Sequence, residues 1–531
     1  MDRIRRNERL AAMTRILVES PNKIFTLGTF CEMFGAAKST LSEDIDILRG
    51  VFAQFHLGQL DTVTGAAGGV RYRPVLAPED AYRTVKDLAQ MLAAPGRVLP
   101  GGFIYMADIL AMPEVVERMG VIIASQFYRA EPDFVLTMET KGIPVALMTA
   151  NEAPDIIYQN MGVYKNTDIG TDWFVPLNDY FEQPNPYEEG NTRWADMWNP
   201  MWLEVTRSSN NNYYFVPLDA IPVGLIYNMD LLKAAGIETL PETYAEFMDC
   251  LEKLEASGTI PYMTPYHWYD IVLEGQMLAY KVEELDVLRT DGVLDSEEFA
   301  RAFKKGLLSI EDEGYQEWLR VIKEKTKYYP DNWQNADATT MFLNGEVAII
   351  EGVGVHMRNI MNDTVHTFEV ATGTYPIVTK ETSELADKAV IRGSAGFSTT
   401  WQVTKTAVNN GTVEDCIDFL MYLTAKDQNA RMINPFSTTT PSNINAEPVD
   451  LFKPLVEKAN EDMKNGFLDW HACAVYAAFD NELISAYEDD LYPGYILGEI
   501  SAEEYTEEYQ YEIEEAIDRA EATSGWDESK W

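Results

Sequence analysis

The chain has 531 residues, a length that predicts two to four domains, and its hydrophobic fraction of 46% excludes a disordered polymer. Its net charge of −43 is uneven, because residues 1–76 hold ten basic and eight acidic side chains and the remaining residues carry −45. That acidic part would repel a polyanion, so any nucleic-acid surface is expected in residues 1–76, called the head below.

Cysteine spacing and apolar patterning exclude further classes. The four cysteines are far apart and form no CxxC pair: Cys31, Cys250, Cys416 and Cys473. This spacing predicts neither a zinc site nor a disulfide framework, and we expect no cofactor and no metal. No stretch of about 18 apolar residues predicts a membrane span. Charged residues interrupt the basic N-terminus, which therefore lacks a signal-peptide core, and the sequence as written predicts a cytoplasmic protein.

Two short helices are predicted first in the head. Apolar residues recur at helical spacing between Leu10 and Leu17, and Pro21 ends that helix. The second predicted helix, residues 27–34, stops before Gly35.

The third predicted helix lies in AKSTLSEDIDILRGVF. Thr40 and Glu43 have the spacing of a capping box. One face of this helix is apolar, and we expect it to be buried: Leu41, Ile45, Leu48 and Phe52. The other face begins with short polar side chains at the helix N-terminus, where backbone amides and the helix dipole favour phosphate.

Residues 59–73 predict two short strands around the glycine-rich turn 65–69, with Arg71 and Arg73 on alternate positions of one face. Three helices followed by a hairpin that carries arginines are typical of a winged helix-turn-helix. A small helical domain with solvated arginines is the alternative, and composition alone does not separate the two.

The segments NERLAAMTRIL, AKSTLSEDI and TVTGAAGGVRY resemble the DNA-binding domain of the Gram-positive purine operon repressor. The resemblance implies that residues 1–76 form a winged-helix domain that contacts operator DNA, as a homodimer on two-fold half-sites. The implied groove-facing residues are Lys38, Ser39, Thr40 and Ser42, flanked by Arg71 and Arg73. The implied phosphate contacts are Arg3, Arg5 and Arg6.

Residues 77–146 predict a helix at 77–92, a loop at 95–102, a helix at 113–128 and a strand at 133–137. The runs LPGGFIYMADIL and EPDFVLTMETKGIPVA resemble the phosphoribosyltransferase-like domain of the same repressor, cut short. In that family two acidic residues and a Gly-Gly-Thr turn bind phosphoribosyl pyrophosphate, and this chain has no such loop. We therefore expect neither sensing of that effector nor an enzymatic reaction.

From residue 147 the pattern changes to alternating strands and helices. APDIIYQN predicts a strand, PVGLIYNMDLLKAAGI a strand and a helix closed by Gly236, and Thr243 opens the next helix. With MFLNGEVAIIEGVGVH, GFSTTWQVTKTA and VEDCIDFLMYLTAKDQNARM, residues 147–531 resemble the extracellular solute-binding proteins of carbohydrate ABC transporters. The resemblance implies a two-lobed α/β clamshell, like periplasmic binding proteins, with ligand in the cleft. That family is normally extracytoplasmic and lipid-anchored, and it implies an ABC permease as partner if the chain is exported.

An oligosaccharide or other small solute is the ligand that this resemblance implies. Sugars present flat C–H faces and hydroxyls, so their sites need aromatic rings together with carboxylates and amides. Residues of these types follow predicted strands or stand among polar residues and prolines: Tyr158, Asn160, Tyr266, Trp268, Trp333, Glu351, Trp401 and Trp470. Ordinary core packing is the alternative for each single tryptophan.

Lobe one is expected to be incomplete. Family members open with a strand, a helix and a second strand before the segment PDII, and here the repressor-like residues occupy those places. The strand at 133–137 is a hypothetical replacement for one of them. The C-terminal stretch SAEEYTEEYQYEIEEAIDRAEA predicts an amphipathic helix, and one face is apolar: Tyr505, Tyr509, Ile513 and Ile517.

These observations favour a non-enzymatic binding protein in which a carbohydrate-type solute-binding body follows a DNA-binding head. Two alternatives stay open. The chain is a transcription regulator of a purine or sugar operon with the body as ligand sensor, or it joins fragments of two genes with partial activity. The abrupt change between residues 138 and 160 favours the joined fragments over evolved regulation.

Overall fold

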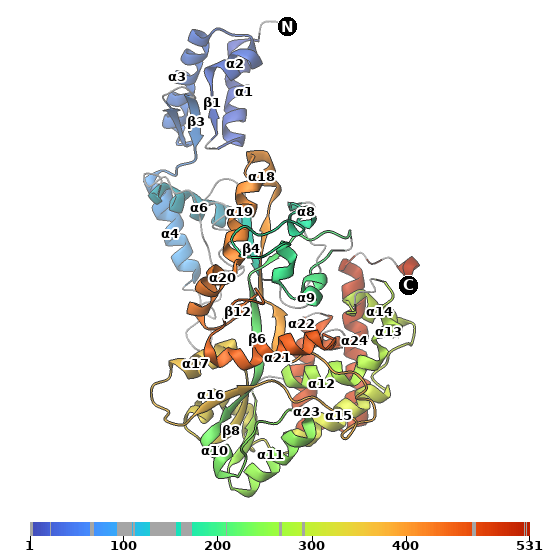
Figure 1. The fold of residues 1–531 in the computed structure, drawn as a ribbon. Coiled ribbons are helices and arrows are strands. Elements are labelled where there is room, and N and C mark those ends of the chain that lie inside the picture. The colour runs from blue at the N-terminus through green and yellow to red at the C-terminus, as the bar shows by residue number, and fades with distance from the viewer. Residues whose placement is uncertain are drawn as a thin grey trace. The chain divides into compact units, whose positions relative to one another are not determined.

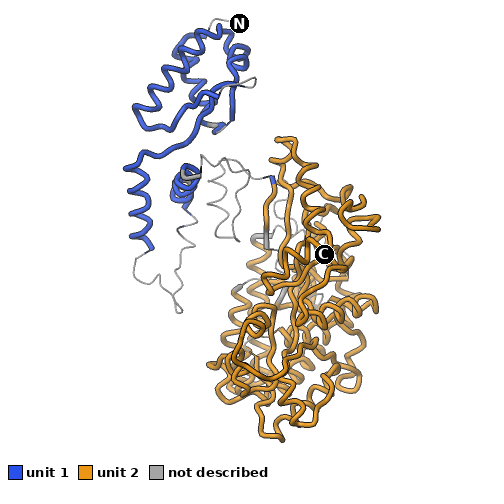
Figure 2. The backbone as a smooth tube through the Cα atoms, turned by 60° about the vertical axis from the view of Figure 1, so that its left-hand side comes forward, with its two compact units in different colours: residues 1–155 blue, residues 156–531 orange. Residues whose placement is uncertain are grey.

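The structure is a computed structural model that describes residues 4–21, 23–63, 68–92, 109, 112–127, 155–160, 173–208, 210–264, 268–288, 292–469, 474–479, 481–524, 526 and 528–531. The chain divides into two compact units, residues 1–155 and residues 156–531 (Figure 2). This boundary lies inside the stretch 138–160, where the two resemblances meet. Within the described residues, no helix combines the length and the apolar character needed to span a membrane.

The head has the predicted three helices and hairpin (Figure 1). Its elements are α1 (Arg6–Glu19), β1 (Ile24–Phe25), α2 (Leu27–Phe34), α3 (Lys38–Phe55), β2 (Gln59–Val63) and β3 (Gly69–Arg73). The strands form an antiparallel sheet in the order β1-β3-β2. Gly35 ends α2 in the left-handed conformation, with φ 60°, which glycine adopts without a steric cost. Of the predicted turn, residues 65–67 lie outside the described residues.

The core of the head contains the whole predicted apolar face of α3. Leu41, Ile45, Leu48 and Phe52 are all buried, together with residues of α1, α2 and the hairpin. The predicted capping box is wrong. The helix begins earlier, at Lys38 with Ala37 as its N-cap, so Thr40 stands inside the first turn.

Among the described residues, two further helices belong to unit 1. They are α4 (Pro78–Leu92) and α6 (Pro113–Phe127), which agree with the helices predicted at 77–92 and 113–128. The loop predicted at 95–102 and the strand predicted at 133–137 lie outside the described residues. The hypothesis that this strand replaces a missing strand of lobe one therefore stays a prediction.

Lobe one of unit 2 is built on a three-stranded antiparallel sheet in the order β4-β11-β5. The strands are β4 (Ile156–Asn160), β5 (Val216–Pro217) and β11 (Thr399–Val403). The helices of this lobe are α8 (Asn178–Phe181), η3 (Trp194–Met197), α9 (Pro200–Val205), α18 (Lys405–Asn410), α19 (Val413–Thr424) and α20 (Lys426–Ile433). Ala425, with extended backbone, divides the single helix predicted from VEDCIDFLMYLTAKDQNARM into α19 and α20.

Lobe two has a six-stranded sheet in the order β10-β6-β8-β7, and β9 and β12 also pair with β6. The strands are β6 (Asp219–Asn228), β7 (Ile260–Met263), β8 (Val347–Val353), β9 (Val370–Gly373), β10 (Ser394–Phe397) and β12 (Thr440–Pro441). Neighbouring residues of β6 enter different cores, because successive side chains of a strand point to opposite faces. Tyr227 lies in one core and Ile226 in the other.

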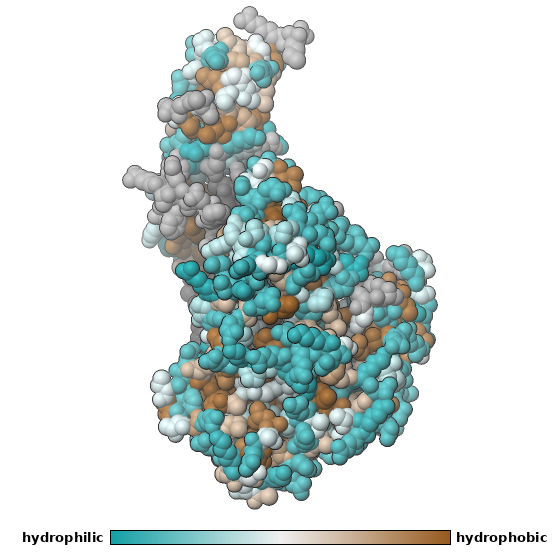
Figure 3. Space-filling model, viewed as in Figure 1, coloured by the Kyte–Doolittle hydropathy of each residue, from teal (hydrophilic) through white to brown (hydrophobic). Residues whose placement is uncertain are grey.

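Helices cover both faces of that sheet (Figure 1). They are α10 (Met229–Ala234), α11 (Tyr244–Ala256), α12 (Trp268–Leu278), α13 (Val282–Leu285), α14 (Ser296–Lys304), α15 (Glu313–Thr326), α16 (Ala338–Leu343), α17 (Gly354–Asn362), α21 (Lys453–Lys464), α22 (Asn481–Ser485), α23 (Tyr492–Leu497) and α24 (Ala502–Ser524). In α24 the predicted apolar face is buried in the larger core, which confirms the prediction: Tyr505, Tyr509, Ile513 and Ile517. The visible face of unit 2 is largely hydrophilic, as its acidic composition predicts (Figure 3).

Two strand pairs connect the lobes as a hinge. Leu218 alone separates β5 of lobe one from β6 of lobe two, and Ser398 alone separates β10 from β11. The two crossings are hydrogen-bonded to each other, since the Leu218 amide donates to the Thr399 carbonyl over 3.0 Å and the Ser398 amide to the Asp219 carbonyl over 3.1 Å. The chain crosses a third time between α20 and β12, which pairs with the first residues of β6.

Candidate ligand cleft and nucleic-acid surface

The carboxyl ends of three strands meet at the hinge. In lobe one, Asn160 ends β4 and pairs with Thr399, the residue that follows Ser398. In lobe two, Val353 at the end of β8 pairs with Val223 near the start of β6, and β7 runs parallel to β8. Ligands of α/β lobes bind beyond the carboxyl ends of strands, so this edge is the candidate cleft.

Lobe one brings two predicted ligand residues together. Tyr158 and Trp401 stand directly opposite each other on β4 and β11, with ring centroids 5.9 Å apart in an edge-to-face arrangement. Trp401 also lies 6.4 Å from Phe419 of α19, and both Tyr158 and Trp401 are half-buried. The Trp401 Nε1–H is buried and has no hydrogen-bond acceptor among the described residues. The pair is therefore an aromatic surface that remains partly open.

Lobe two contributes two half-buried tryptophans, Trp268 soon after β7 in sequence and Trp333, whose neighbour Tyr329 lies 5.4 Å from the ring of Tyr262 on β7. Trp268 is the first residue of α12, and Trp333 begins the short helix η5 (Trp333–Asn335). The Trp333 ring lies 5.4 Å from Tyr329 and 6.1 Å from Tyr492. Two predicted ligand residues lie outside the described residues: Tyr266 and Trp470.

Glu351 is more deeply placed than a ligand-contacting carboxylate would be expected to be, since only 1% of it is exposed. Its oxygens accept hydrogen bonds from the Tyr375 hydroxyl and the Tyr269 amide, each over 2.8 Å, and from the Thr264 hydroxyl over 3.0 Å. Burial raises the pKa of Glu351 to about 7. The side chain is thus engaged by donors of its own lobe.

Asp219, which the sequence did not single out, joins all three hinge segments. Its carboxylate accepts from the Thr399 amide over 2.8 Å and also from the hydroxyls of Thr399 and Thr439. It is 5% exposed, and burial raises its pKa. Because these partners are 180 and more residues away in sequence, no local pattern could have identified it.

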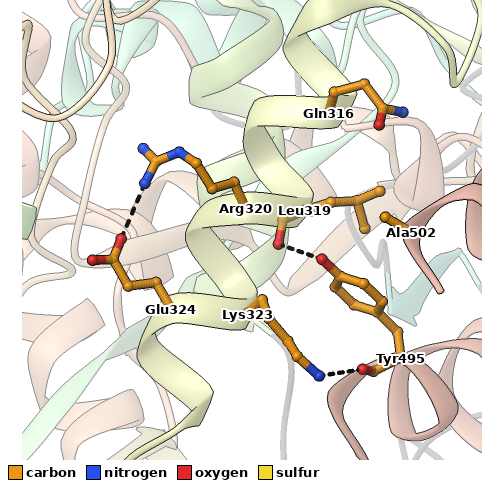
Figure 4. Close-up of a pocket in the computed structure, with 7 residues that line it drawn as sticks. All are labelled: Gln316, Leu319, Arg320, Lys323, Glu324, Tyr495 and Ala502. Carbon is orange, nitrogen blue, oxygen red and sulfur yellow. Dashed lines mark hydrogen bonds and ion pairs between the residues drawn. The ribbon is translucent and has the colours of Figure 1, made fainter. Parts of the chain in front are cut away.

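A surface hollow of lobe two does not use the predicted residues. It is lined by Gln316, Leu319, Arg320, Lys323, Glu324, Tyr495 and Ala502 (Figure 4). Its charged groups are already engaged by the protein: the Lys323 ammonium donates to the Tyr495 carbonyl over 2.6 Å, and Arg320 pairs with Glu324 over 3.1 Å. We therefore do not place the ligand there.

The N-terminal turn of α3 presents polar side chains to solvent. Lys38, Ser39 and Ser42 are exposed and Thr40 is half-buried. The predicted groove-facing residues thus share one accessible helix end within the head.

The two arginines of the hairpin are paired with a carboxylate that the sequence did not single out. Arg73 Nε lies 3.1 Å from Asp61 Oδ2, and Arg71 Nη2 lies 3.8 Å from the same atom. Arg71 and Asp61 are cross-strand partners in the hairpin. Alternate residues of a strand share one face, so the pattern that places Arg71 and Arg73 together also places Asp61 of the paired strand on their face. This pairing could have been predicted from the sequence.

The N-terminal arginines differ from one another. Arg6 lies 2.8 Å from Asp44 and 3.1 Å from Glu43 of α3, whereas Arg5 is exposed and its amide donates to Glu8. Arg3 lies outside the described residues. Of these three predicted phosphate contacts, Arg6 would have to share its guanidinium with a carboxylate.

Two α/β lobes joined by hinge strands define unit 2 as a clamshell-type binding protein. A family model described as bacterial extracellular solute-binding protein matches residues 142–430, more than half of the chain. The chain belongs to this family. A second model, the N-terminal domain of bacterial purine repressors, matches residues 5–74.

Comparison with individual known proteins gives the same division into head and body. The purine biosynthesis transcriptional repressor PurR of Bacillus subtilis is 43% identical over 149 residues, which are 28% of this chain and 52% of that protein. The chain spans about half the length of the curated relatives it matches. A xanthine phosphoribosyltransferase of Geobacillus thermodenitrificans is 37% identical over 71 residues, 13% of this chain and 37% of that enzyme, so the phosphoribosyltransferase-like segment is only weakly supported.

Solved structures resemble the body. The apo form of RafE from Streptococcus pneumoniae has a TM-score of 0.51 at 15% identity and covers 75% of this chain and 95% of its own. A chitin oligosaccharide binding protein has a TM-score of 0.50 at 16% identity and covers 75% and 94%. At these identities the likeness establishes the fold alone. The chain thus joins a purine-repressor-like head to a solute-binding body, as the sequence predicted.

Proposed function

We propose that residues 156–531 bind a neutral oligosaccharide in the cleft at the hinge and catalyse no reaction. The observation that carries this proposal is the presence of half-buried aromatic rings near the hinge-facing strand ends of both lobes. Tyr158 and Trp401 supply them in lobe one, and Trp268 and Trp333 in lobe two. Aromatic rings pack against the C–H faces of sugars, and a body with excess negative charge disfavours an anionic ligand.

The hinge gives this site a mechanism of capture. A sugar that contacts both lobes has a higher affinity for the closed arrangement, so it shifts the population towards closure. The hinge strands absorb the change in backbone angles, and Asp219 keeps the three crossings in register.

Thermal unfolding of the full chain tests the proposal. We expect a neutral tetrasaccharide from a panel of chitotetraose, maltotetraose and xylotetraose to raise the melting temperature, because a ligand at 100 times its Kd stabilises by about 2.7 kcal/mol. Trp268→Ala is expected to raise the Kd roughly 30-fold, since the loss of a buried aromatic contact costs about 2 kcal/mol.

The matched control is Trp173→Ala. Trp173 is 70% exposed and stands beside Phe174, which bridges Thr404 at the end of β11 remote from the hinge. This substitution should leave the Kd for the tetrasaccharide unchanged. A panel in which no sugar shifts the melting temperature would contradict the proposal.

We propose a second role for the head, which is to contact operator DNA as a homodimer. Exposed polar side chains lie at the start of α3: Lys38, Ser39 and Ser42. Arg5, the residue before α1, is also exposed. Filter binding to a purine-operon operator over a series of salt concentrations tests this role. We expect a negative salt slope that Lys38→Ala reduces by about 1, and a slope of zero would contradict this role.

The family implies an ABC permease as a further partner if the protein is exported.

A further inference from the structure

The two oxygens of Glu351 bind two separate elements of lobe two, the end of β7 and the first turn of α12, where Trp268 lies. Oε2 accepts from the Thr264 hydroxyl over 3.0 Å, directly after β7, and Oε1 accepts from the Tyr269 amide over 2.8 Å, in the first turn of α12. Glu351 itself lies on β8, the strand parallel to β7. A single side chain thus connects the end of one strand to the start of the helix that follows it.

The surroundings make this connection stiff. Thr264 and Tyr269 are fully buried, and the Tyr269 ring stacks on Tyr375 with centroids 5.0 Å apart. The Tyr375 hydroxyl donates to the same oxygen as the Tyr269 amide, over 2.8 Å. Buried hydrogen bonds of this kind cost free energy when one partner is removed, because the other is left unsatisfied.

A buried cation stands beside the carboxylate. Lys325 Nζ lies 2.7 Å from Asp270, and neither side chain is more than 1% exposed. The ammonium also lies 5.4 Å from the Tyr262 ring centroid and 5.8 Å from that of Tyr269. Its charge opposes the effect of burial on Glu351 and favours the carboxylate that accepts hydrogen bonds.

We propose that Glu351 is a positioning residue of the oligosaccharide cleft, which fixes Trp268 at the start of α12 through the Tyr269 amide, without touching the ligand. The Thr264 hydroxyl holds the other oxygen of Glu351 in place. This inference rests on the proposed sugar-binding function. Because Trp268 directly precedes the anchored Tyr269, its backbone is held in position before the ligand arrives. Preorganisation of a contact in this way raises affinity because less conformational freedom is lost on binding.

Glu274 offers a matched comparison within the same lobe. It is also fully buried, lies on the same helix α12, and accepts from the Val475 amide over 2.9 Å. That hydrogen bond connects α12 to the short helix η9 (Val475–Ala477), remote in sequence from Thr264. If Glu351 only stabilised the core, its substitution would have the same effects as the substitution of Glu274.

The experiment compares three variants of the full chain. Glu351→Met keeps the volume but removes every acceptor, so we expect the Kd for the tetrasaccharide to rise about tenfold or more. Glu351→Gln should stay within about threefold of the parent. Its amide oxygen can accept from the Tyr269 amide, and its NH₂ can donate to the hydroxyls on the other side. Glu274→Met should lower the melting temperature and leave the Kd unchanged.

Hydrogen exchange of the Tyr269 amide provides a readout that does not require ligand. We expect faster exchange in Glu351→Met and parent-like exchange in Glu274→Met. If Glu351→Met does not fold, Thr264→Val replaces it, since a methyl group takes the place of the anchoring hydroxyl and a severalfold rise in Kd is expected.

Equal affinity and equal Tyr269 exchange in Glu351→Met and the parent would overturn the inference while the sugar-binding proposal stands. A parent that binds no sugar of the panel would overturn both the proposed function and the ligand role of Glu351. In that case the exchange result alone decides whether the carboxylate holds the start of α12. An equal loss of affinity in Glu274→Met would show that any defect of this core weakens binding, and it would also overturn the inference.

Discussion

Asp44 of the head and Glu274 of lobe two are both buried carboxyl groups, but they are stabilised in opposite ways. In the head, fully buried Asp44 lies 2.8 Å from both Arg6 and Arg9, so its charge is compensated. In lobe two, Glu274 is equally buried among apolar and tyrosine side chains, and burial raises its pKa to about 8. The head thus ties two helices with an ion pair, whereas lobe two, which buries the pair of Lys325 and Asp270, leaves Glu274 without a cation and keeps that carboxyl group neutral.

The largest effect is expected from breaking the ion pair of the head. Asp44→Ala leaves Arg9, which is 8% exposed, without its carboxylate, and such a loss costs about 3–5 kcal/mol. All 11 tryptophans lie at residue 173 or later, so tryptophan fluorescence follows unit 2 alone. We expect far-UV circular dichroism and proteolysis to detect an unfolded head. An unchanged proteolysis pattern would contradict this account of Asp44.

Glu274 should instead make stability depend on pH. In the unfolded chain its carboxyl group titrates near the ordinary value of 4.5, and in the folded chain near 8. Between these values only the folded state keeps the proton, so its contribution is complete at low pH and is lost as pH rises. From pH 5 to 7.5 the loss is about 3 kcal/mol.

Glu274→Gln tests this, because a neutral amide does not titrate in either state. Urea unfolding monitored by tryptophan fluorescence should show a flatter pH dependence in the variant than in the parent. Some slope should remain, since burial also raises the pKa of Glu351 to about 7. Identical pH profiles would mean that Glu274 is ionised in the folded core.

A smaller effect is expected on the surface of the head. Asp61 compensates both wing arginines, so Asp61→Asn should leave Arg71 and Arg73 available to phosphate. Such half-exposed pairs contribute about 0.2–1 kcal/mol to stability, so the fold should persist. In filter binding we expect tighter nonspecific DNA association and a salt slope steeper by about 1. An unchanged slope would place the wing away from DNA.

Sequence patterns predicted the helices and strands better than they predicted which residues distant in sequence contact one another. Helical periodicity identified the buried faces of α3 and α24, and strand alternation identified the wing, because each depends on side-chain direction along one element. The hinge carboxylate Asp219 and the anchoring role of Glu351 depend on residues distant in sequence. The sequence assigned Glu351 to the ligand from its place after an apolar strand, and only the fold reveals its internal donors.

One helix of the head and one of lobe two differ at their N-caps, and here the expected effect is smallest. In lobe two, α11 begins with a full capping box of Thr243 and Glu246, whereas the N-cap of α3 in the head is Ala37, which offers no side-chain acceptor. Ala37→Ser should therefore add a cap to exposed amides of α3 and stabilise the head by about 0.5–1 kcal/mol. Thr243→Ala should destabilise unit 2 by a similar amount. Thermal unfolding followed by circular dichroism measures the stability change in Ala37→Ser. Thermal unfolding followed by tryptophan fluorescence measures that in Thr243→Ala. If Ala37→Ser has no effect while Thr243→Ala does, the α3 amides are already satisfied by another group.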